Sequence, residues 1–271
     1  MRIISKIDVE NSLSMFEAIE TIRQAFIELS KKTAIIPQRL HLSVEKSEAT
    51  TLIMPAYLAV NDALACKIVS VFPANFCQNL PVINGLVVLL DEKNGKPLAI
   101  LEGASLTALR TGAASGLATD LLARQEAKTL AVFGAGAQSA TQIEGVCAVR
   151  SIEKVWVYDR RVENSERLVS KIQKKIDAEF FIAETPKQAV TDADIICTAT
   201  TSETPVFDGN DLRDGVHING VGSFKPNMRE IDFTTLKKCS KIVVDSRENS
   251  LHEAGELVQA IEQNVINESS I

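Results

Sequence analysis

Hydrophobic residues along this chain follow two patterns, and the change between them near residue 125 predicts two domains. In the first part, apolar residues recur every three or four positions over residues 14–32, which indicates a helix. Short apolar runs between polar turns then predict strands over residues 40–44, 51–54, 63–72, 86–90 and 97–101. A helix rich in alanine and glycine is expected over residues 105–123, where small side chains favour close packing. Residues 1–124 therefore read as an α+β domain.

After Lys128, apolar runs alternate with segments of helical pattern. Strands are predicted over residues 130–133, 155–158, 180–183, 194–198, 216–221 and 242–245, and helices over residues 138–149, 164–175 and 186–190. Strands that alternate with crossover helices form a parallel sheet with helices on both faces. The predicted fold class is therefore α/β, with a doubly wound parallel sheet of Rossmann type over residues 125–271.

The turn after the first strand of this second part carries the strongest functional signal. Gly134-Ala-Gly-Ala-Gln138 follows an apolar run, and the next predicted strand ends in Asp159. In a dinucleotide-binding unit, Gly134 allows the tight turn, Gly136 lets the backbone approach a pyrophosphate at a helix N-terminus, and Asp159 holds a ribose diol. Ser139 replaces the usual third glycine or alanine. The alternative is an ordinary glycine turn, with Asp159 as a helix cap.

Composition excludes several other classes of protein. The chain has 271 residues, 45% of them hydrophobic, which is enough for a sizeable core. A net charge of −6 without a basic block argues against a nucleic-acid partner. No apolar run is long enough to span a membrane, and the N-terminus has no signal-peptide core, so we expect a cytoplasmic protein without a membrane partner.

Cysteine and histidine residues give no sign of metal chemistry. The five cysteines are scattered without CxxC spacing, which predicts reduced and mostly buried thiols. The three histidines form neither an HxH nor an HExxH pattern, so no metal site is expected. His217 lies in an apolar run, and we expect a hydrogen-bonded strand residue there rather than a catalyst.

Three cations of the first part lie among apolar neighbours, namely Arg39, Lys67 and Arg110. A single such residue is usually structural, because a salt bridge or a snorkelling side chain satisfies its charge. Three of them ahead of a nucleotide-binding fold favour a clamp for a carboxylate substrate. Arginine binds a carboxylate through two parallel hydrogen bonds, and lysine adds a point charge.

These residues belong to a set of motifs that resembles the ornithine cyclodeaminase/mu-crystallin family over essentially the whole chain. The motifs are Pro37-x-Arg39, Leu52-Ile-Met-Pro55, Lys67, Pro73-x-Asn75, Leu106-Thr-Ala-Leu-Arg-Thr-Gly112, Gly134-Ala-Gly-Ala-Gln138 and Gly222-Ser-Phe-Lys-Pro226. The resemblance implies a homodimer with a substrate-binding and dimerisation domain ahead of the Rossmann domain. It also implies an active site in the cleft between the two domains.

The resemblance also implies roles for particular residues. Arg39, Lys67 and Arg110 match the catalytic positions that hold the substrate carboxylate, and Met54 and Phe224 match positions beside the substrate. The implied cofactor is NAD(H), with NADP(H) as the alternative. Its implied contacts are Thr111, Gly134, Gly136, Ala137, Gln138, Asp159, Arg160, Thr198 and Thr200.

Two departures from the family pattern decide the expected activity. Cyclodeaminases have a glutamate at the position of Leu52, and they and the alanine dehydrogenases have an acid at the position of Phe224. A cyclic ketimine needs neither carboxylate, because a protonated imine carbon is already electrophilic and has only to be placed against the nicotinamide. We therefore expect reduction of 1-pyrroline-2-carboxylate or 1-piperideine-2-carboxylate to L-proline or L-pipecolate.

Three other functions of the family stay open from the sequence. They are an ornithine cyclodeaminase that uses another carboxylate, an amino-acid dehydrogenase like the alanine dehydrogenases, and a non-catalytic protein that binds cofactor and small ligands, like mu-crystallin. By the resemblance, family members also continue for about 50 residues past the position of Ile271 and return to the first domain. The sequence is thus expected to be that of a truncated or a shortened member.

Overall fold

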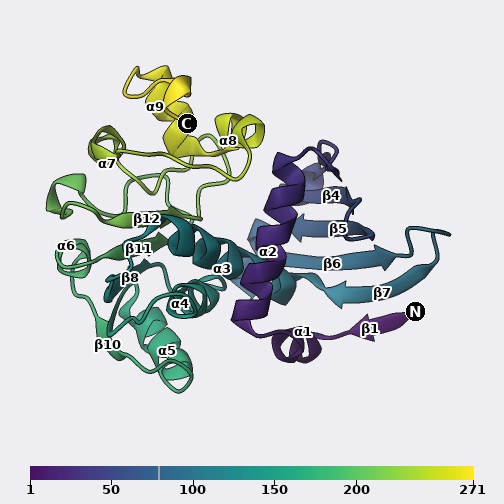
Figure 1. The fold of residues 1–271 in the computed structure, drawn as a ribbon, viewed down its shortest axis with the longest axis horizontal. Helices are drawn as coiled ribbons and strands as arrows, with labels where there is room; N and C mark the ends of the chain where they lie inside the picture. The colour runs from purple at the N-terminus through teal and green to yellow at the C-terminus, as the bar shows by residue number, and fades with distance from the viewer. Residues whose placement is uncertain (79) are drawn as a thin grey trace. The chain divides into compact units, whose positions relative to one another are not determined.

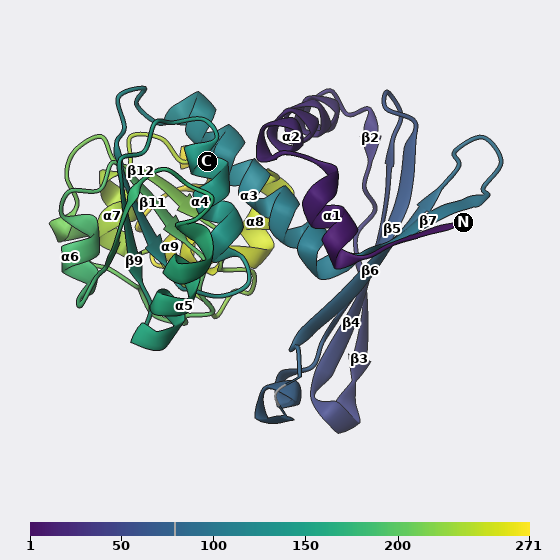
Figure 2. The same cartoon turned by 90° about the horizontal axis from the view of Figure 1, so that it is seen from below.

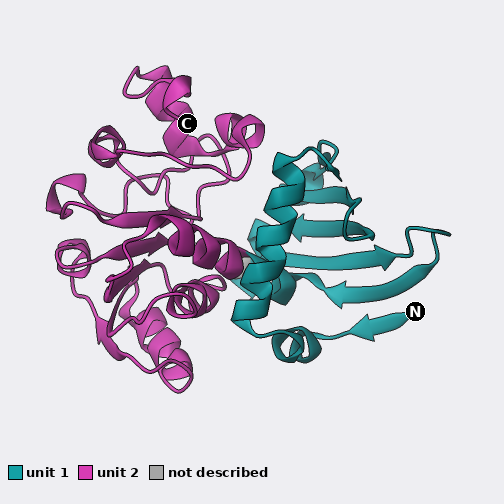
Figure 3. Cartoon of the chain, viewed as in Figure 1, with its two compact units in different colours: residues 1–110 teal, residues 111–271 magenta. Residues whose placement is uncertain are grey.

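The computed structural model describes residues 1–78 and 80–271, and the chain divides into two compact units (Figures 1 and 3). Unit 1 is Met1–Arg110 and unit 2 is Thr111–Ile271. The division falls inside helix α3 (Gly103–Leu122), whereas the sequence suggested a boundary just after that helix. The ranges 1–124 and 125–271, as substrate and cofactor domains, stay a prediction.

Unit 1 is built on a 7-stranded sheet of order β1-β7-β6-β5-β4-β2, with β3 also paired to β4. The strands are β1 (Arg2–Ile4), β2 (Ala34–Ile35), β3 (Leu40–Val44), β4 (Ala49–Leu58), β5 (Ala63–Val71), β6 (Ile83–Leu90) and β7 (Pro97–Glu102). All five predicted strands are present. Strand β1 runs parallel to β7, and the other pairs are antiparallel.

Two helices of unit 1, α1 (Lys6–Ser12) and α2 (Met15–Ser30), lie on the same side of this sheet (Figure 2). Each begins at a capping box, in which the Ser5 or Ser14 hydroxyl accepts from the backbone three residues later and an acidic side chain there accepts from the serine backbone N–H. The predicted helix over residues 14–32 is confirmed as α2. Two short 3-10 helices, η1 (Glu45–Ser47) and η2 (Pro73–Gln78), follow β3 and β5.

The two faces of the unit 1 sheet differ in exposure. Lys67 pairs across the strands with Met54 and Val87, so these three side chains share one face, which we call the clamp face. Ala99 is 5% exposed on this face, where the helices cover the sheet. The opposite face, which we call the open face, carries exposed large apolar side chains at Ile3, Ile35, Leu40, Leu42 and Leu86.

Unit 2 contains a 5-stranded, fully parallel sheet of order β10-β9-β8-β11-β12. Its strands are β8 (Thr129–Phe133), β9 (Lys154–Tyr158), β10 (Glu179–Ile182), β11 (Ile195–Thr198) and β12 (His217–Gly220). Its further helices are α4 (Ser139–Cys147), α5 (Val162–Ile172), α6 (Pro186–Val190), α7 (Phe233–Lys238), α8 (Arg247–Glu253) and α9 (Gly255–Glu262), with short 3-10 helices η3 (Gly209–Asp211) and η4 (Glu268–Ser270).

Helices cover both faces of this parallel sheet, which confirms the doubly wound Rossmann-type fold. Val132 and Val157 pack with α4 and α5 on one face, and Phe133 and Ile196 pack with α6 on the other. The expected strand over residues 242–245 is wrong. That segment pairs with no strand of the described sheet. Its side chains Ile242 and Val244 pack against the cluster that contains residues of α7 and α9.

Smaller expectations have mixed outcomes. No described helix is both long and apolar enough to cross a membrane. His217 lies on β12 with its Nε2 atom 3.0 Å from Asn219 Oδ1, which confirms the expected strand residue. All five cysteines are free, but the expectation that most are buried is wrong, since only Cys197 is buried and Cys77 and Cys239 are exposed.

Candidate active site

The three predicted cations of unit 1 gather around Lys67. Met54 on β4 is the cross-strand partner of Lys67 on β5, Arg39 immediately precedes β3, and Arg110 lies on α3. Burial, followed by the charges of Arg110 and then Arg39, lowers the pKa of Lys67 from 10.5 to about 8. Both guanidinium groups must lie near the ammonium group to act on it in this way. The structure thus brings the three side chains together.

Such a cluster is suited to binding an anion. The like charges raise the free energy of the protonated lysine, and a carboxylate placed among them reverses that effect. Leu52 lies two residues before Met54 on the same strand and therefore on the same clamp face. This position contributes only an apolar side chain to the clamp face.

In unit 2, the glycine turn between β8 and α4 has the conformation that the sequence predicts. Gly134 has a φ of +88°, and a Cβ atom there would lie 2.7 Å from the Ala199 carbonyl oxygen, so only glycine fits. A Cβ atom at Gly136 would meet nothing within 4 Å, which leaves the backbone open to a ligand. The buried Gln138 Oε1 has no hydrogen-bond partner in the described parts of the chain.

Asp159 at the end of β9 is tied to this turn. Its Oδ2 atom accepts from the Ala135 N–H at 2.9 Å, and its Oδ1 atom accepts from the Arg161 N–H and from Asn164 Nδ2. The N-cap of α5 is Arg161, so Asp159 does not act as a helix cap. Arg160 is exposed, with Nη2 3.5 Å from the Ser202 hydroxyl. Contact of Asp159 or Arg160 with a ribose or phosphate stays a prediction.

Thr111 is buried beside a close contact between α3 and α4. A Cβ atom at Gly112 would overlap the Thr141 carbonyl oxygen, and one at Gly145 would overlap the Gly112 carbonyl oxygen. The expected close packing of the small-residue helix is confirmed. Since Thr141 lies in the first turn of α4, this contact places Thr111 near the helix that follows the glycine turn.

The ends of β11 and β12 hold the remaining predicted residues and one that the sequence did not reveal. Glu230 is 0% exposed, and its carboxylate accepts three hydrogen bonds, from the Thr198 hydroxyl at 2.8 Å, the Thr200 N–H at 2.6 Å and the Gly222 N–H at 2.7 Å. Phe224 lies in the loop after β12 and is 46% exposed. Its ring centroid is 5.7 Å from Lys225 Nζ. No motif in the sequence marked Glu230.

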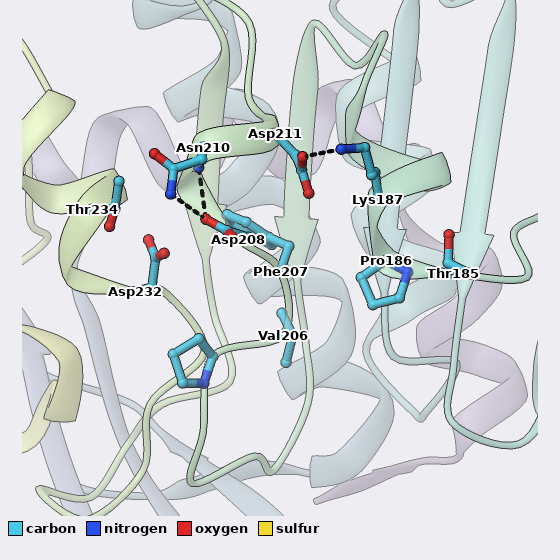
Figure 4. Close-up of a pocket in the computed structure, with 11 residues that line it drawn as sticks. Thr185, Pro186, Lys187, Val206, Phe207, Asp208, Asn210, Asp211, Asp232 and Thr234 are labelled. Carbon is cyan, nitrogen blue, oxygen red and sulfur yellow. Dashed lines mark hydrogen bonds and ion pairs between the residues drawn. The ribbon is translucent and has the colours of Figure 1, made fainter.

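An open hollow of about 620 Å³ on unit 2 contains none of the predicted residues (Figure 4). It lies between α6, η3 and α7, and several of its polar groups are paired with one another. Lys187 Nζ contacts Asp211 Oδ1 at 2.7 Å, and Asp208 accepts from the Asn210 backbone and side chain.

The predicted residues therefore form two groups, each within one unit. One is a cluster of cations on the clamp face of unit 1. The other surrounds the carboxyl ends of the parallel strands in unit 2, which is where ligands bind in open α/β sheets. Together they define a protein with a dinucleotide-type fold and a second sheet that carries a cluster of cations.

Comparison with known proteins identifies the family. The model of the ornithine cyclodeaminase/mu-crystallin family matches residues 1–269, and the chain belongs to this family. Over its full 271 residues the chain is 41% identical to a Delta(1)-pyrroline-2-carboxylate reductase of Bacillus cereus and covers 83% of that protein. The predicted likeness to the ketimine reductase members is thus confirmed.

Solved structures agree with this assignment. The Thermococcus litoralis Delta(1)-pyrroline-2-carboxylate reductase, in complex with NADH and L-proline, superposes with a TM-score of 0.95 at 42% identity, covering all of this chain and 84% of that one. An archaeal alanine dehydrogenase dimer with bound NAD superposes with a TM-score of 0.91 at 31% identity, covering all of this chain and 82% of that one.

Proposed function

We propose that this protein is an NAD(P)H-dependent reductase of cyclic ketimine carboxylates. It converts 1-pyrroline-2-carboxylate or 1-piperideine-2-carboxylate to L-proline or L-pipecolate. The observation that carries the proposal is the gathering of Arg39 and Arg110 around the ammonium group of Lys67, whose pKa is lowered to about 8. Full-length likeness to pyrroline-2-carboxylate reductases supports the same substrate class.

Each residue of the cluster has a separate task in this reaction. Arg39 and Arg110 hold the substrate carboxylate, because a guanidinium group donates two parallel hydrogen bonds to it. Lys67 adds the third positive charge, orients the carboxylate and donates a hydrogen bond near the reacting nitrogen. Met54, beside Lys67 on the clamp face, presents apolar surface to the ring of the imine. Phe224, in the loop after β12, stays a candidate for contact with the substrate.

Residues of unit 2 fit a nicotinamide cofactor. The pyrophosphate would bind at the glycine turn, because the turn is open at Gly136 and leads into the N-terminus of α4. The residues that would hold it are Gly134, Gly136, Ala137 and Gln138, together with Thr111 beside α4. When bound, NADH supplies the hydride for the imine carbon. Asp159 would accept from the ribose hydroxyls and favour NADH over NADPH, while Arg160 would tolerate a 2′-phosphate. Thr198 and Thr200 would flank the nicotinamide ribose.

The clamp face argues against deamination of ornithine. A distal ammonium group on the substrate needs a carboxylate partner, and burying it unpaired would cost several kcal/mol. Leu52 lies on the clamp face where that partner would be, and Phe224 replaces the second acid. The same apolar side chains suit the ring of a cyclic imine.

We propose that the protein acts as a homodimer through the open face of unit 1. Ile3, Leu40 and Leu42 there are 80%, 59% and 56% exposed, which is unusual for side chains on one side of a sheet. A second copy of the same face would bury them. We further propose a cytoplasmic location, which fits five free cysteines.

The decisive assay follows NADH oxidation by the absorbance of its nicotinamide. We expect consumption of NADH with 1-pyrroline-2-carboxylate or 1-piperideine-2-carboxylate, none with pyruvate plus ammonia, and no ammonia from L-ornithine. Lys46 is exposed, so the Lys46→Met variant serves as a control for the loss of a cation and should keep wild-type activity. Robust ammonia release from ornithine, or inactivity with both imines, would refute the proposed function. Light scattering of the same samples tests the dimer.

A further inference from the structure

We infer that Glu230 is a positioning residue, which holds the loops after β11 and β12 in the arrangement that receives the nicotinamide half of the cofactor. This inference rests on the proposed cofactor. The glycine turn after β8 and the acid after β9 account for the pyrophosphate and the adenosine ribose. We therefore place the other half of the cofactor, the nicotinamide and its ribose, at the carboxyl ends of β11 and β12.

The hydrogen bonds of Glu230 connect the carboxyl end of β11 and the loop after it to the loop after β12, and these two strands are paired in the sheet. Its Oε1 atom accepts from the Thr200 N–H in the loop after β11, and its Oε2 atom accepts from the Gly222 N–H in the loop after β12. Oε2 also accepts from the Thr198 hydroxyl at the end of β11. The carboxylate is fully buried, so water does not compete for these donors.

The loops joined by Glu230 also pack against the glycine turn. A Cβ atom at Gly222 would overlap the Thr200 carbonyl oxygen, and one at Gly134 would lie 3.0 Å from Thr200 Cγ2. Thr200 is thus enclosed between the phosphate turn and the loop after β12. A shift of either loop would change the space beside Thr200 where we place the nicotinamide ribose.

Asp194 offers a control at the amino ends of the strands in the same sheet, whereas Glu230 acts at their carboxyl ends. It is 7% exposed and accepts from the Lys128 and Thr129 N–H groups at 2.8 and 2.9 Å, just before β8 and β11 begin. Like Glu230, it is a buried carboxylate that accepts from backbone N–H groups, here at the start of β8, and it also pairs with Arg124 and Arg213. It lies at the amino ends of the strands, where no ligand is expected.

Glu230→Gln is the informative substitution because it keeps the size of the side chain. An amide has one acceptor oxygen, so its NH₂ group must face the N–H of either Thr200 or Gly222. One loop then loses its partner. Thr198→Val removes a single donor and leaves both backbone bonds to Glu230 in place.

The test measures NADH binding by nicotinamide fluorescence, ADP-ribose binding by calorimetry, and the melting temperature. For Glu230→Gln we expect the Kd for NADH to rise about tenfold or more, and that for ADP-ribose to change by less than about twofold. For Thr198→Val we expect a smaller rise, of about threefold, for NADH. Asp194→Asn should lower the melting temperature and leave both Kd values unchanged.

Two results with the Glu230→Gln variant would overturn the inference. One is an NADH affinity equal to that of the wild type. The other is an equal loss of affinity for NADH and for ADP-ribose, which would indicate general damage to the cofactor site. If the Glu230→Gln variant does not fold, the Thr198→Val variant takes its place, and an NADH affinity equal to that of the wild type would then overturn the inference. No imine enters these measurements, so a protein that binds NADH but reduces no imine refutes the proposed function alone. A wild-type protein that binds no NADH refutes both.

Discussion

The surroundings of Lys67 give the proposed reaction a defined dependence on pH. Burial, then Arg110 and then Arg39 lower the pKa of Lys67 to about 8. The protonated lysine attracts the substrate carboxylate and the neutral lysine does not. With the free enzyme, kcat/KM should therefore be constant below about pH 7 and fall as the pH rises through about 8. Well above that value it should fall about tenfold for each pH unit.

Removing one neighbouring cation should move this midpoint in a known direction. Arg110→Met removes the larger of the two charge effects, so the pKa of Lys67 rises and the midpoint moves to higher pH. Arg39→Met should move it in the same direction by less. Arg110→Met should also reduce the plateau of kcat/KM by roughly 3–5 kcal/mol in transition-state free energy, because the carboxylate loses a charged partner.

The assay compares initial rates of NADH oxidation from pH 6 to pH 10 in wild-type protein and the two variants. The imine substrate titrates as well, but its pKa is the same in all three experiments. A midpoint that moves with the substitution therefore belongs to the enzyme. A midpoint shared by wild type and Arg110→Met would refute the assignment to Lys67. Lys46→Met, an exposed cation in η1, should leave both the midpoint and the plateau unchanged.

Two further predictions concern unit 2. Asp159→Ser should shift the ratio of kcat/KM values from NADH toward NADPH, because it removes the carboxylate that accepts from the ribose and repels a 2′-phosphate; an unchanged ratio would count against contact of Asp159 with the ribose. Burial lowers the pKa of His217, so the unfolded state binds more protons and the melting temperature should fall as the pH drops through about 6.5. His217→Gln should weaken that dependence, whereas substitution of the exposed His41 should not.

Regular periodicity made most of the fold predictable from the sequence. The predicted strand over residues 40–44 matches β3 at both ends, and the helix over residues 186–190 matches α6. Strand β1 and helix α1 were not predicted, because elements of 3 and 7 residues are too short to show a clear hydrophobic period. The segment over residues 242–245 has the apolar content of a strand, but its side chains pack against the cluster that contains α7 and α9 residues, and a local pattern does not reveal which surface an apolar run will cover.

The candidate site was predictable where its chemistry depends on residue type and short spacing. The glycine turn and Asp159 are visible as a motif, and the contact of Asp159 with the Ala135 N–H follows from the adjacency of β8 and β9. Glu230 has no such signal, because its partners Thr198 and Thr200 lie about 30 residues earlier. Its role arises only when the topology places β11 beside β12.

If Arg39, Lys67 and Arg110 hold the substrate as proposed, we expect this cluster to select for an α-carboxylate. Lys67 is partly removed from water and faces two further positive charges, so its protonated form is destabilised until an anion arrives. A bound carboxylate raises the pKa of Lys67 again, and near pH 8 binding is therefore coupled to uptake of a proton. An amide or ester analogue offers no negative charge, so it does not offset the repulsion that Arg110 and Arg39 exert on the Lys67 ammonium group. We therefore expect such analogues to bind more weakly than the carboxylate, because only the carboxylate offsets this repulsion.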